Sequence, residues 1–443
     1  MKKWKQCAAA MCAALMLSSP LSAQAHWLSS KQEKEIGDAA VAEFKQTYRT
    51  YENETLTHIQ QRFLEWNPDK LWMYGTPGKK RGLEPILCSD KDEINAVSYG
   101  GGQVIVHQPM LDFVASRDPG VYYGAGNRRN EPYRVNNIYQ MASLASVVGH
   151  EFGHWENEDM LRMHDKQMDT RLLAAMIPVG NVWAMLGVSA GSSLINAFNS
   201  RQMGFRTEQQ ADEKAMEYSE MVPEFSIGGE AIFQRRTIIY KTANGTIDKV
   251  NWLHPHSKAG KRFERALKYM EKSSRGFFKW KGTALQVDGA DFSGEEETPL
   301  SNSSNPFERY LYEVGQIATA IKYDFARTRN FELLPENEVF TNGSTSTTAL
   351  LLRGRGTDGK DHVKVVDTFI NLPMIDAKAV LALDFQSLRD GINSGKLKGE
   401  ARNLAFLRWF VEKYEQNLSK YGPRGTNASE YDTTEAREDD PSN

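Results

Sequence analysis

The hydrophobic pattern predicts a chain that is mostly helical, with a small amount of strand. Apolar residues recur at the three-to-four-residue spacing of a helix in several long segments. These segments are 28–66, 138–154, 208–218, 257–272, 307–325, 376–390 and 398–420. Shorter runs of strand character occupy 84–107, and two more lie at 349–352 and 363–366. We therefore expect an α+β fold in which helices dominate.

The strand-like segment 84–107 contains a glycine-rich corner. The runs 94–99 and 103–107 are joined by Gly100-Gly101-Gly102, which is typical of a β-hairpin or a tight corner. If one of these strands is an exposed edge beside a catalytic helix, an extended peptide could pair with it. The alternative is an ordinary strand inside a sheet, and the sequence leaves both open.

Two further segments have open interpretations. Residues 172–198 are apolar, but Pro178, Gly180 and other breakers interrupt them, so we expect a buried helical hairpin or a membrane-facing patch rather than a spanning helix. Residues 116–137 are polar and rich in glycine and proline, and they lead into the helix at 138. They form either a cover over a cleft or a solvated loop.

The first 25 residues have the pattern of a bacterial secretory signal. A basic start is followed by an apolar run at 8–17 and by Ala23-Gln24-Ala25, a small-residue cleavage site. Removal of this signal takes three lysines away, so the formal net charge changes from −3 to −6. Cys88 would then be the single thiol, which excludes an intramolecular disulfide. We expect a periplasmic or secreted protein, and its mildly acidic charge argues against nucleic-acid binding.

The strongest chemical signal is His150-Glu151-Phe152-Gly153-His154, an H-E-x-x-H spacing at the end of an apolar helix. Residues four apart lie on one face of a helix, so both imidazoles can reach a single ion. Zinc suits neutral imidazole ligands and leaves a position open for water. Glu151 is then placed to take a proton from that water. Two solvated histidines on a surface helix are the alternative, but the apolar run before the motif predicts burial, where such groups need a partner.

A second acidic pair follows on the helix predicted at 208–218. Glu208 and Asp212 are four residues apart and face the same way. A carboxylate is a common third ligand of catalytic zinc, and an acid one turn on can accept the outer N–H of a ligating histidine. Ala211 and Ala215 give the same helix a small-residue face that could pack closely on another helix.

Together these elements resemble the M48 family of zinc metallopeptidases, which belong to the gluzincins. The resemblance spans about residues 30–270. It rests on Glu33-x-Glu35-Ile36-Gly37, Asn95-Ala96, the H-E-x-x-H motif, Glu208-x-x-Ala211-Asp212-x-x-Ala215, and His254-Pro255 followed by Arg262. The resemblance implies one zinc ion per chain, bound by His150, His154 and Glu208. It also implies that Glu151 activates water, that Asp212 supports a ligand, and that the gluzincin-type domain is mostly helical with a small edge-strand element.

By the same resemblance, His254 is a catalytic candidate with two open roles. It would either stabilise the oxyanion or block the open zinc position, and a purely structural histidine before proline is equally compatible. Trp155 stands where the family usually has a smaller apolar residue, and the loop at 116–137 is longer than usual. Both differences would alter access to the site.

Composition changes divide the chain. We expect a signal peptide at 1–25, a metallopeptidase domain at 26–287, a linker at 288–305 rich in Gly, Ser, Asn and Glu, and a smaller α+β domain at 306–421. The acidic tail at 422–443 is expected to be disordered. Gly354, Gly356 and Gly359 spell G-x-G-x-x-G, but no helix follows them, so we expect a hairpin turn rather than a dinucleotide site.

The leading hypothesis is an exported zinc endopeptidase whose substrates are polypeptides, by family resemblance unfolded or misassembled envelope proteins. One alternative is a metal-binding chaperone or adaptor with a latent site. Another is a membrane-anchored protease, and peripheral contact with the membrane or with envelope proteins fits the apolar segment 172–198.

Overall fold

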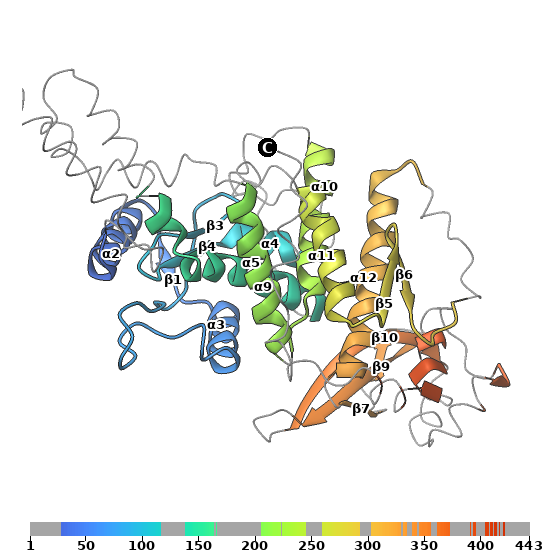
Figure 1. Cartoon of the computed structure of the whole chain (residues 1–443). Coiled ribbons are helices and arrows are strands. Elements are labelled where there is room, and N and C mark those ends of the chain that lie inside the picture. Colours follow the sequence, from blue (N-terminus) through green and yellow to red (C-terminus); the bar gives the residue numbers. More distant parts are fainter. Residues whose placement is uncertain are drawn as a thin grey trace, which may run out of the picture.

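The protein has a mostly helical α+β fold, as the hydrophobic pattern predicts. A computed structural model describes residues 28–116, 138–165 except 164, 205–244 except 223, 259–292 and 303–328, four strands between 331 and 372, and parts of 390–420. Among these residues, four helices and a small sheet form the N-terminal part, and four further helices and six strands follow (Figure 1). Within the described residues, no helix is both long and apolar enough to span a bilayer.

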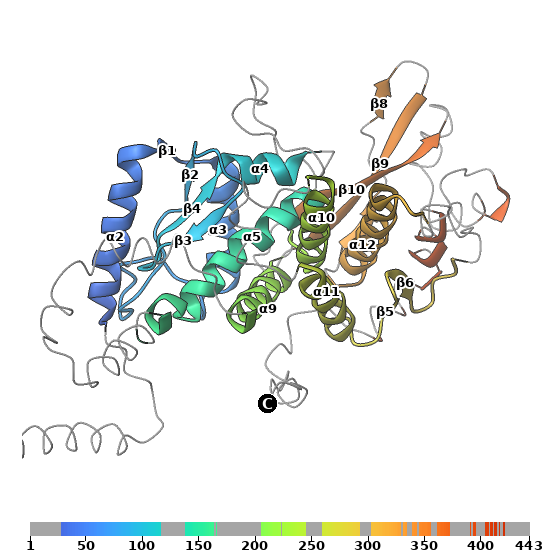
Figure 2. The same ribbon diagram turned by 90° about the horizontal axis from the view of Figure 1, so that it is seen from above.

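A four-stranded sheet organises the N-terminal part. Its strands run in the order β1-β2-β4-β3, where β2 and β4 are parallel and the other neighbours are antiparallel. The strands are β1 (Thr50–Tyr51), β2 (Leu87–Ser89), β3 (Ala96–Ser98) and β4 (Val104–His107). The helices around them are α2 (Ser30–Thr47), α3 (Glu54–Trp66), α4 (Gln108–Ala115) and α5 (Ile138–Glu156). Figure 2 shows α2 and α5 on either side of this sheet.

The prediction of one helix over 28–66 is wrong, because the chain breaks into α2, β1 and α3. Ser29 starts α2 through a capping box with Gln32. After α2 ends, Thr50 and Tyr51 pair with β2 instead of continuing the helix. Asn53 then caps α3 by accepting from the backbone N–H groups of the next turn, at 3.1 and 3.2 Å. Pairing with a distant strand decides this break, and helical periodicity does not reveal it.

The predicted hairpin is confirmed as β3–β4. Gly100, Gly101 and Gly102 all have positive φ, at 81°, 57° and 81°, a conformation that favours glycine. The backbone N–H of Gln103 donates to the carbonyl of Gly100 at 3.1 Å and closes the corner. In the described sheet, β3 is an edge strand with β4 as its one neighbour.

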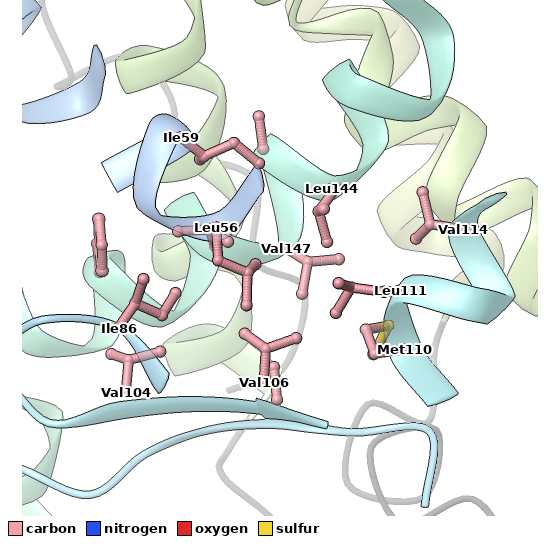
Figure 3. Packing of buried hydrophobic residues seen from close by; sticks show 14 of the residues in the cluster. Leu56, Ile59, Ile86, Val104, Val106, Met110, Leu111, Val114, Leu144 and Val147 are labelled. Carbon is pink, nitrogen blue, oxygen red and sulfur yellow. The ribbon is translucent and has the colours of Figure 1, made fainter. Parts of the chain in front are cut away.

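A hydrophobic core fills the space between this sheet and its helices. Figure 3 shows Leu56 and Ile59 from α3 facing Val104 and Val106 from β4, with Leu144 and Val147 from α5 closing the core. These side chains are at most 1% exposed. The burial of this apolar surface fixes α5, and with it the H-E-x-x-H motif, against the sheet.

A second core lies among the later helices. The hydrophobic pattern predicts parts of these helices but not α10. They are α9 (Phe205–Met221), α10 (Gly228–Asn244), α11 (Ala259–Ser273) and α12 (Pro306–Thr328). A two-stranded sheet, β5 (Phe278–Lys281) with β6 (Ala284–Val287), packs on the same cluster. The described residues at 404–410 also join it.

The C-terminal strands form a second four-stranded sheet. They are β7 (Phe331–Leu334), β8 (Val339–Asn342), β9 (Thr345–Arg355) and β10 (Asp361–Leu372), and β7, β8 and β10 all pair with β9. The expected hairpin around the glycine-rich turn is confirmed, with strands longer than the patterns at 349–352 and 363–366.

Several predicted segments lie outside the described residues. They are the signal at 1–25, the loop at 117–137, the apolar segment at 172–198, most of the linker at 288–305, nearly all of the helix at 376–390, and the tail. The division into two domains stays a prediction. The structure adds that α12, beyond the expected linker, shares one core with α9, α10 and α11.

Candidate metal centre

Two helices that pack unusually closely carry the candidate ligands. A Cβ added to Gly149 of α5 would lie 3.0 Å from Cα of Ala215 on α9, and one added to Gly153 would lie 2.9 Å from the carbonyl oxygen of Ala211. The pairing of 149 with 215 and of 153 with 211 means that the helices run in opposite directions. The small-residue face expected on α9 is thus confirmed, with glycines of α5 opposite it. This close approach brings the acidic face of α9 beside the motif.

Three buried side chains converge where α5 and α9 meet. His150, His154 and Glu208 each offer one donor atom, and these atoms all lie within 4.8 Å of one another. The two Nε2 atoms are 3.1 Å apart, and the carboxylate of Glu208 lies 3.2 Å from Nε2 of His150 and 3.7 Å from that of His154. All three side chains are at most 6% exposed. The sequence therefore predicted correctly which residues come together.

Each histidine is held from behind by a carboxylate. Nδ1 of His150 lies 2.8 Å from Asp212, and Nδ1 of His154 lies 2.8 Å from Asp159. An ionised carboxylate only accepts hydrogen bonds, so these partners place the proton of each neutral ring on Nδ1. Both Nε2 lone pairs then point into the same small space.

This donor set fits a zinc ion. Two lone pairs at 3.1 Å repel each other unless a cation lies between them. Zinc accepts two neutral imidazoles and one carboxylate, and outer carboxylates commonly orient its histidine ligands. Burial lowers the pKa of His150, but its hydrogen bonds to Asp212 and Glu208 more than offset this and raise the pKa to about 10. The surrounding carboxylates therefore favour positive charge here, and a metal ion would compete with a proton.

A buried ionic chain supports Asp212 from the far side. Nε of Arg262 on α11 donates to Asp212 at 2.6 Å, and its Nη2 donates to the other carboxylate oxygen. Burial raises the pKa of Asp212, but Arg262 and His150 together outweigh burial and lower this pKa below its usual value. Glu230 on α10 lies 3.7 Å from Arg262 and accepts hydrogen bonds from Ser146 and Gln234. This chain ties three helices to the orientation of one histidine.

Glu151 follows the ligand candidate His150 directly in α5 and is 3% exposed. It belongs to α5, which contacts β3 and β4. The pKa of Tyr99, which follows β3 directly, is raised above its usual value. Burial is the largest cause, followed in order by the charges of Glu93, Tyr48 and Glu151. The charge of Glu151 thus contributes to the electrostatic environment at the end of the edge strand.

Two supporting residues were not predicted from the sequence, and one predicted residue lies outside the described part of the chain. Asp159 and Glu230 were not anticipated. Asp159 follows the motif by only five residues, but a turn after α5, rather than helical spacing, carries it back to His154. Arg262 was noted only through the family resemblance, without a predicted partner, and the structure shows it donating to Asp212. His254 lies outside the described residues, so its role stays a prediction.

Comparison with known proteins agrees with this geometry. No curated protein sequence matches the chain. The family model for peptidase family M48 matches residues 74–269, a range that contains both histidines, Glu151, Glu208 and the carboxylates behind them. Over residues 74–269, the chain is therefore similar to peptidase family M48.

Proposed function

We propose that this protein is an exported zinc-dependent endopeptidase that hydrolyses peptide bonds in polypeptide substrates. The observation that carries the proposal is the buried convergence of His150, His154 and Glu208, with the buried Glu151 next to His150 in the chain. The match of residues 74–269 to a metallopeptidase family supports the same reaction class. One zinc ion per chain would occupy the three-residue site.

The residues divide the chemistry between them. His150, His154 and Glu208 would hold zinc, which when bound lowers the pKa of water and polarises a carbonyl group. Glu151 takes the proton from the attacking water and returns it to the leaving amine. Asp212 and Asp159 keep each imidazole in the tautomer that presents Nε2.

The edge strand β3 supports an endopeptidase rather than an enzyme acting on small molecules. It is paired with β4 on one side and lies in contact with α5, the helix that carries Glu151. An extended substrate could add to its other side, where no described strand pairs with it, through main-chain hydrogen bonds that would hold a peptide independently of its sequence. Such binding suits unfolded polypeptides, because a folded chain rarely offers an extended segment.

The location and the substrate class follow from the first 25 residues and the acidic net charge. A basic start, an apolar run and a small-residue cleavage site support export, and with it a periplasmic or secreted enzyme. Substrates would then be unfolded or misassembled envelope proteins, with peripheral envelope contact and no nucleic-acid partner. Cys88, buried as a free thiol, is compatible with a fold that needs no disulfide in that compartment.

Substitution of the general base tests the proposal. Glu151→Gln should lower casein hydrolysis by roughly 10²–10⁴-fold while zinc content stays at one per chain, because the substitution removes the base but no ligand. Glu156→Gln on the same helix is the matched control, because Glu156 pairs with Lys214 and Tyr218, away from the ligands. Its activity should stay near that of the wild type.

The outcomes separate the alternatives. Equal activity of wild type and Glu151→Gln would reject the mechanism. A wild type that binds zinc but cleaves nothing would favour the chaperone or adaptor. Loss of zinc in His150→Ala and Glu208→Ala identifies the metal site itself, independently of activity.

A further inference from the structure

We propose that Arg81 is a positioning residue of the metal centre: it fixes the turn that carries Asp159 to His154. Arg81 lies in the segment between α3 and β2 and does not touch the ligands. The inference rests on the proposed zinc site but concerns the affinity and geometry of that site, not the reaction.

The guanidinium of Arg81 joins three separate groups. Nε and Nη2 donate to the two carboxylate oxygens of Glu33, at 2.8 and 3.0 Å. Nη2 also donates to the backbone carbonyl of Trp155 at 2.8 Å, and Nη1 donates to Glu158 at 2.9 Å. The planar fork of arginine suits this, because its donors point in fixed directions. Two of the three groups belong to the last turn of α5 and the residues after it.

The turn after α5 needs such support. The helix ends at Glu156, and Glu158 has φ of 57°, a left-handed conformation that is unfavourable for a residue with a side chain. The next residue is Asp159, whose carboxylate lies 2.8 Å from Nδ1 of His154. Arg81 bonds to the carbonyl of Trp155 and to the side chain of Glu158, and so restrains the chain on both sides of the turn. Loss of these bonds would let the turn relax and move Asp159 away from the imidazole of His154.

Glu33, the third group that Arg81 binds, is also held in place. Glu33 on α2 is 1% exposed and also accepts a hydrogen bond from the backbone N–H of Gly101 at 3.3 Å. The glycine corner that ends β3 packs against the same turn, because a Cβ on Gly100 would lie 1.7 Å from Sδ of Met160. Arg81 therefore connects α2 and the end of the edge strand with the outer partner of a zinc ligand.

Metal affinity tests this role without relying on proteolysis. Arg81→Gln should weaken binding of cobalt(II), used as a spectroscopic probe, by roughly 10–100-fold, the range usual for loss of an outer ligand partner. Its visible absorption bands should also change, because the imidazole of His154 is no longer held in one orientation. Arg81→Lys keeps a positive charge opposite Glu33 and should fold, but an ammonium cannot reach all three groups. It should also bind cobalt more weakly than the wild type.

Arg62→Gln is the matched control. The guanidinium of Arg62 also bridges two carboxylates, Glu65 and Glu224, and its side chain is 11% exposed, against 14% for Arg81. Arg62 bonds to Glu65 and Glu224, and not to Trp155, Glu158 or Asp159 among the described residues. This variant should therefore lose thermal stability but keep the wild-type cobalt affinity and spectrum. Wild-type cobalt binding in both Arg81 variants, or an equal loss of affinity in Arg62→Gln, would overturn the proposal.

A double substitution shows whether Arg81 acts through Asp159. If it does, Arg81→Gln with Asp159→Asn should bind cobalt about as weakly as Asp159→Asn alone. If the fold-losses of cobalt affinity in the two single variants multiply in the double variant, Arg81 does not act through Asp159. A wild type that binds cobalt at His150 and Glu208 but cleaves no casein would reject the proposed function and leave this inference standing, whereas no cobalt at that site would reject both.

Discussion

Each ligand histidine depends on a carboxylate that does not touch the metal position. Asp212 and Asp159 set the tautomers of His150 and His154, and Arg262 holds Asp212 from behind. A ligand residue is thus recognisable by spacing, but its chemistry is completed by groups from elsewhere in the chain. The first predictions therefore concern single side chains.

Asp212→Asn should weaken zinc binding by roughly 10–100-fold, because the outer carboxylate of His150 is lost. It should also lower the free energy of unfolding, since Arg262 keeps its charge in a buried position with a neutral partner. Competition with a chelating dye measures the affinity. Glu220→Gln is the control, because Glu220 is a buried carboxylate on the same helix that bonds Ser273 instead of a ligand. Equal zinc affinity in Asp212→Asn and the wild type would show that the carboxylate of Asp212 does not determine the tautomer of His150.

His107 predicts how stability depends on pH. Burial lowers its pKa from 6.5 to about 3, with a smaller effect from Lys91, and its Nδ1 lies 2.7 Å from Ser89. His107 therefore becomes protonated near pH 6.5 in the unfolded chain but only near pH 3 in the folded chain. The stability contributed by neutral His107 is complete above pH 6.5 and is lost as pH falls from 6.5 towards 3.

Urea unfolding of the metal-free protein at pH 7 and at pH 4.5 checks this expectation. The wild type should lose a few kcal/mol, roughly 1.4 for each pH unit below 6.5, and His107→Gln should lose less over the same interval. Parallel losses in the two proteins would assign the acid sensitivity to other groups.

At the scale of elements, the approach of α5 and α9 decides whether the site exists. The motif supplies two ligands on one helix, and the third reaches them because Gly149 and Gly153 face Ala215 and Ala211. Close packing of this kind leaves no room for one additional methyl group without displacement.

Gly153→Ala should therefore weaken zinc binding although alanine is the better helix former. The added Cβ would lie 2.9 Å from the carbonyl oxygen of Ala211, so α9 must shift and carry Glu208 with it. Gly260→Ala on α11 is the control, because a Cβ there meets nothing within 4 Å. It should raise the free energy of unfolding by up to about 1 kcal/mol and leave affinity unchanged. If Gly153→Ala keeps full zinc affinity, the spacing of these helices is not what limits the site.

The sequence revealed the elements whose signals are local and missed those set by distant contacts. Helical spacing places the two histidines on one face of α5 and the two acids on one face of α9, and the family resemblance links the two pairs. The convergence of His150, His154 and Glu208 could therefore be predicted. The corner at Gly100–Gly102 was visible because left-handed backbone favours glycine. By contrast, the break between α2 and α3 depends on pairing with β2, and Asp159 depends on a left-handed turn at a glutamate. Neither feature leaves a periodic pattern.

At the scale of the whole molecule, one hydrophobic core contains residues from both sides of the linker that composition predicts. Composition places a linker at 288–305, between the metallopeptidase part and the C-terminal unit. One hydrophobic cluster nevertheless includes Met216 of α9, Phe263 of α11, Ile321 of α12 and Trp409. Arg262, which supports the metal ligands, belongs to the same α11. Stability of the C-terminal unit and integrity of the site should therefore be coupled.

Trp409→Ala tests this coupling. The indole is 2% exposed, and its ring centroid lies 4.7 Å from that of Tyr323 and 5.7 Å from that of Phe277. Its removal should lower the free energy of unfolding by about 3–5 kcal/mol through the cavity it leaves. Because the core is shared, helix loss followed by circular dichroism and zinc release followed with a dye should shift together to lower temperature. Phe307→Ala, at a 38% exposed position of the same unit, should shift neither by much. Two separate transitions, with zinc release unmoved, would instead show that the C-terminal unit folds independently, as its composition alone suggests.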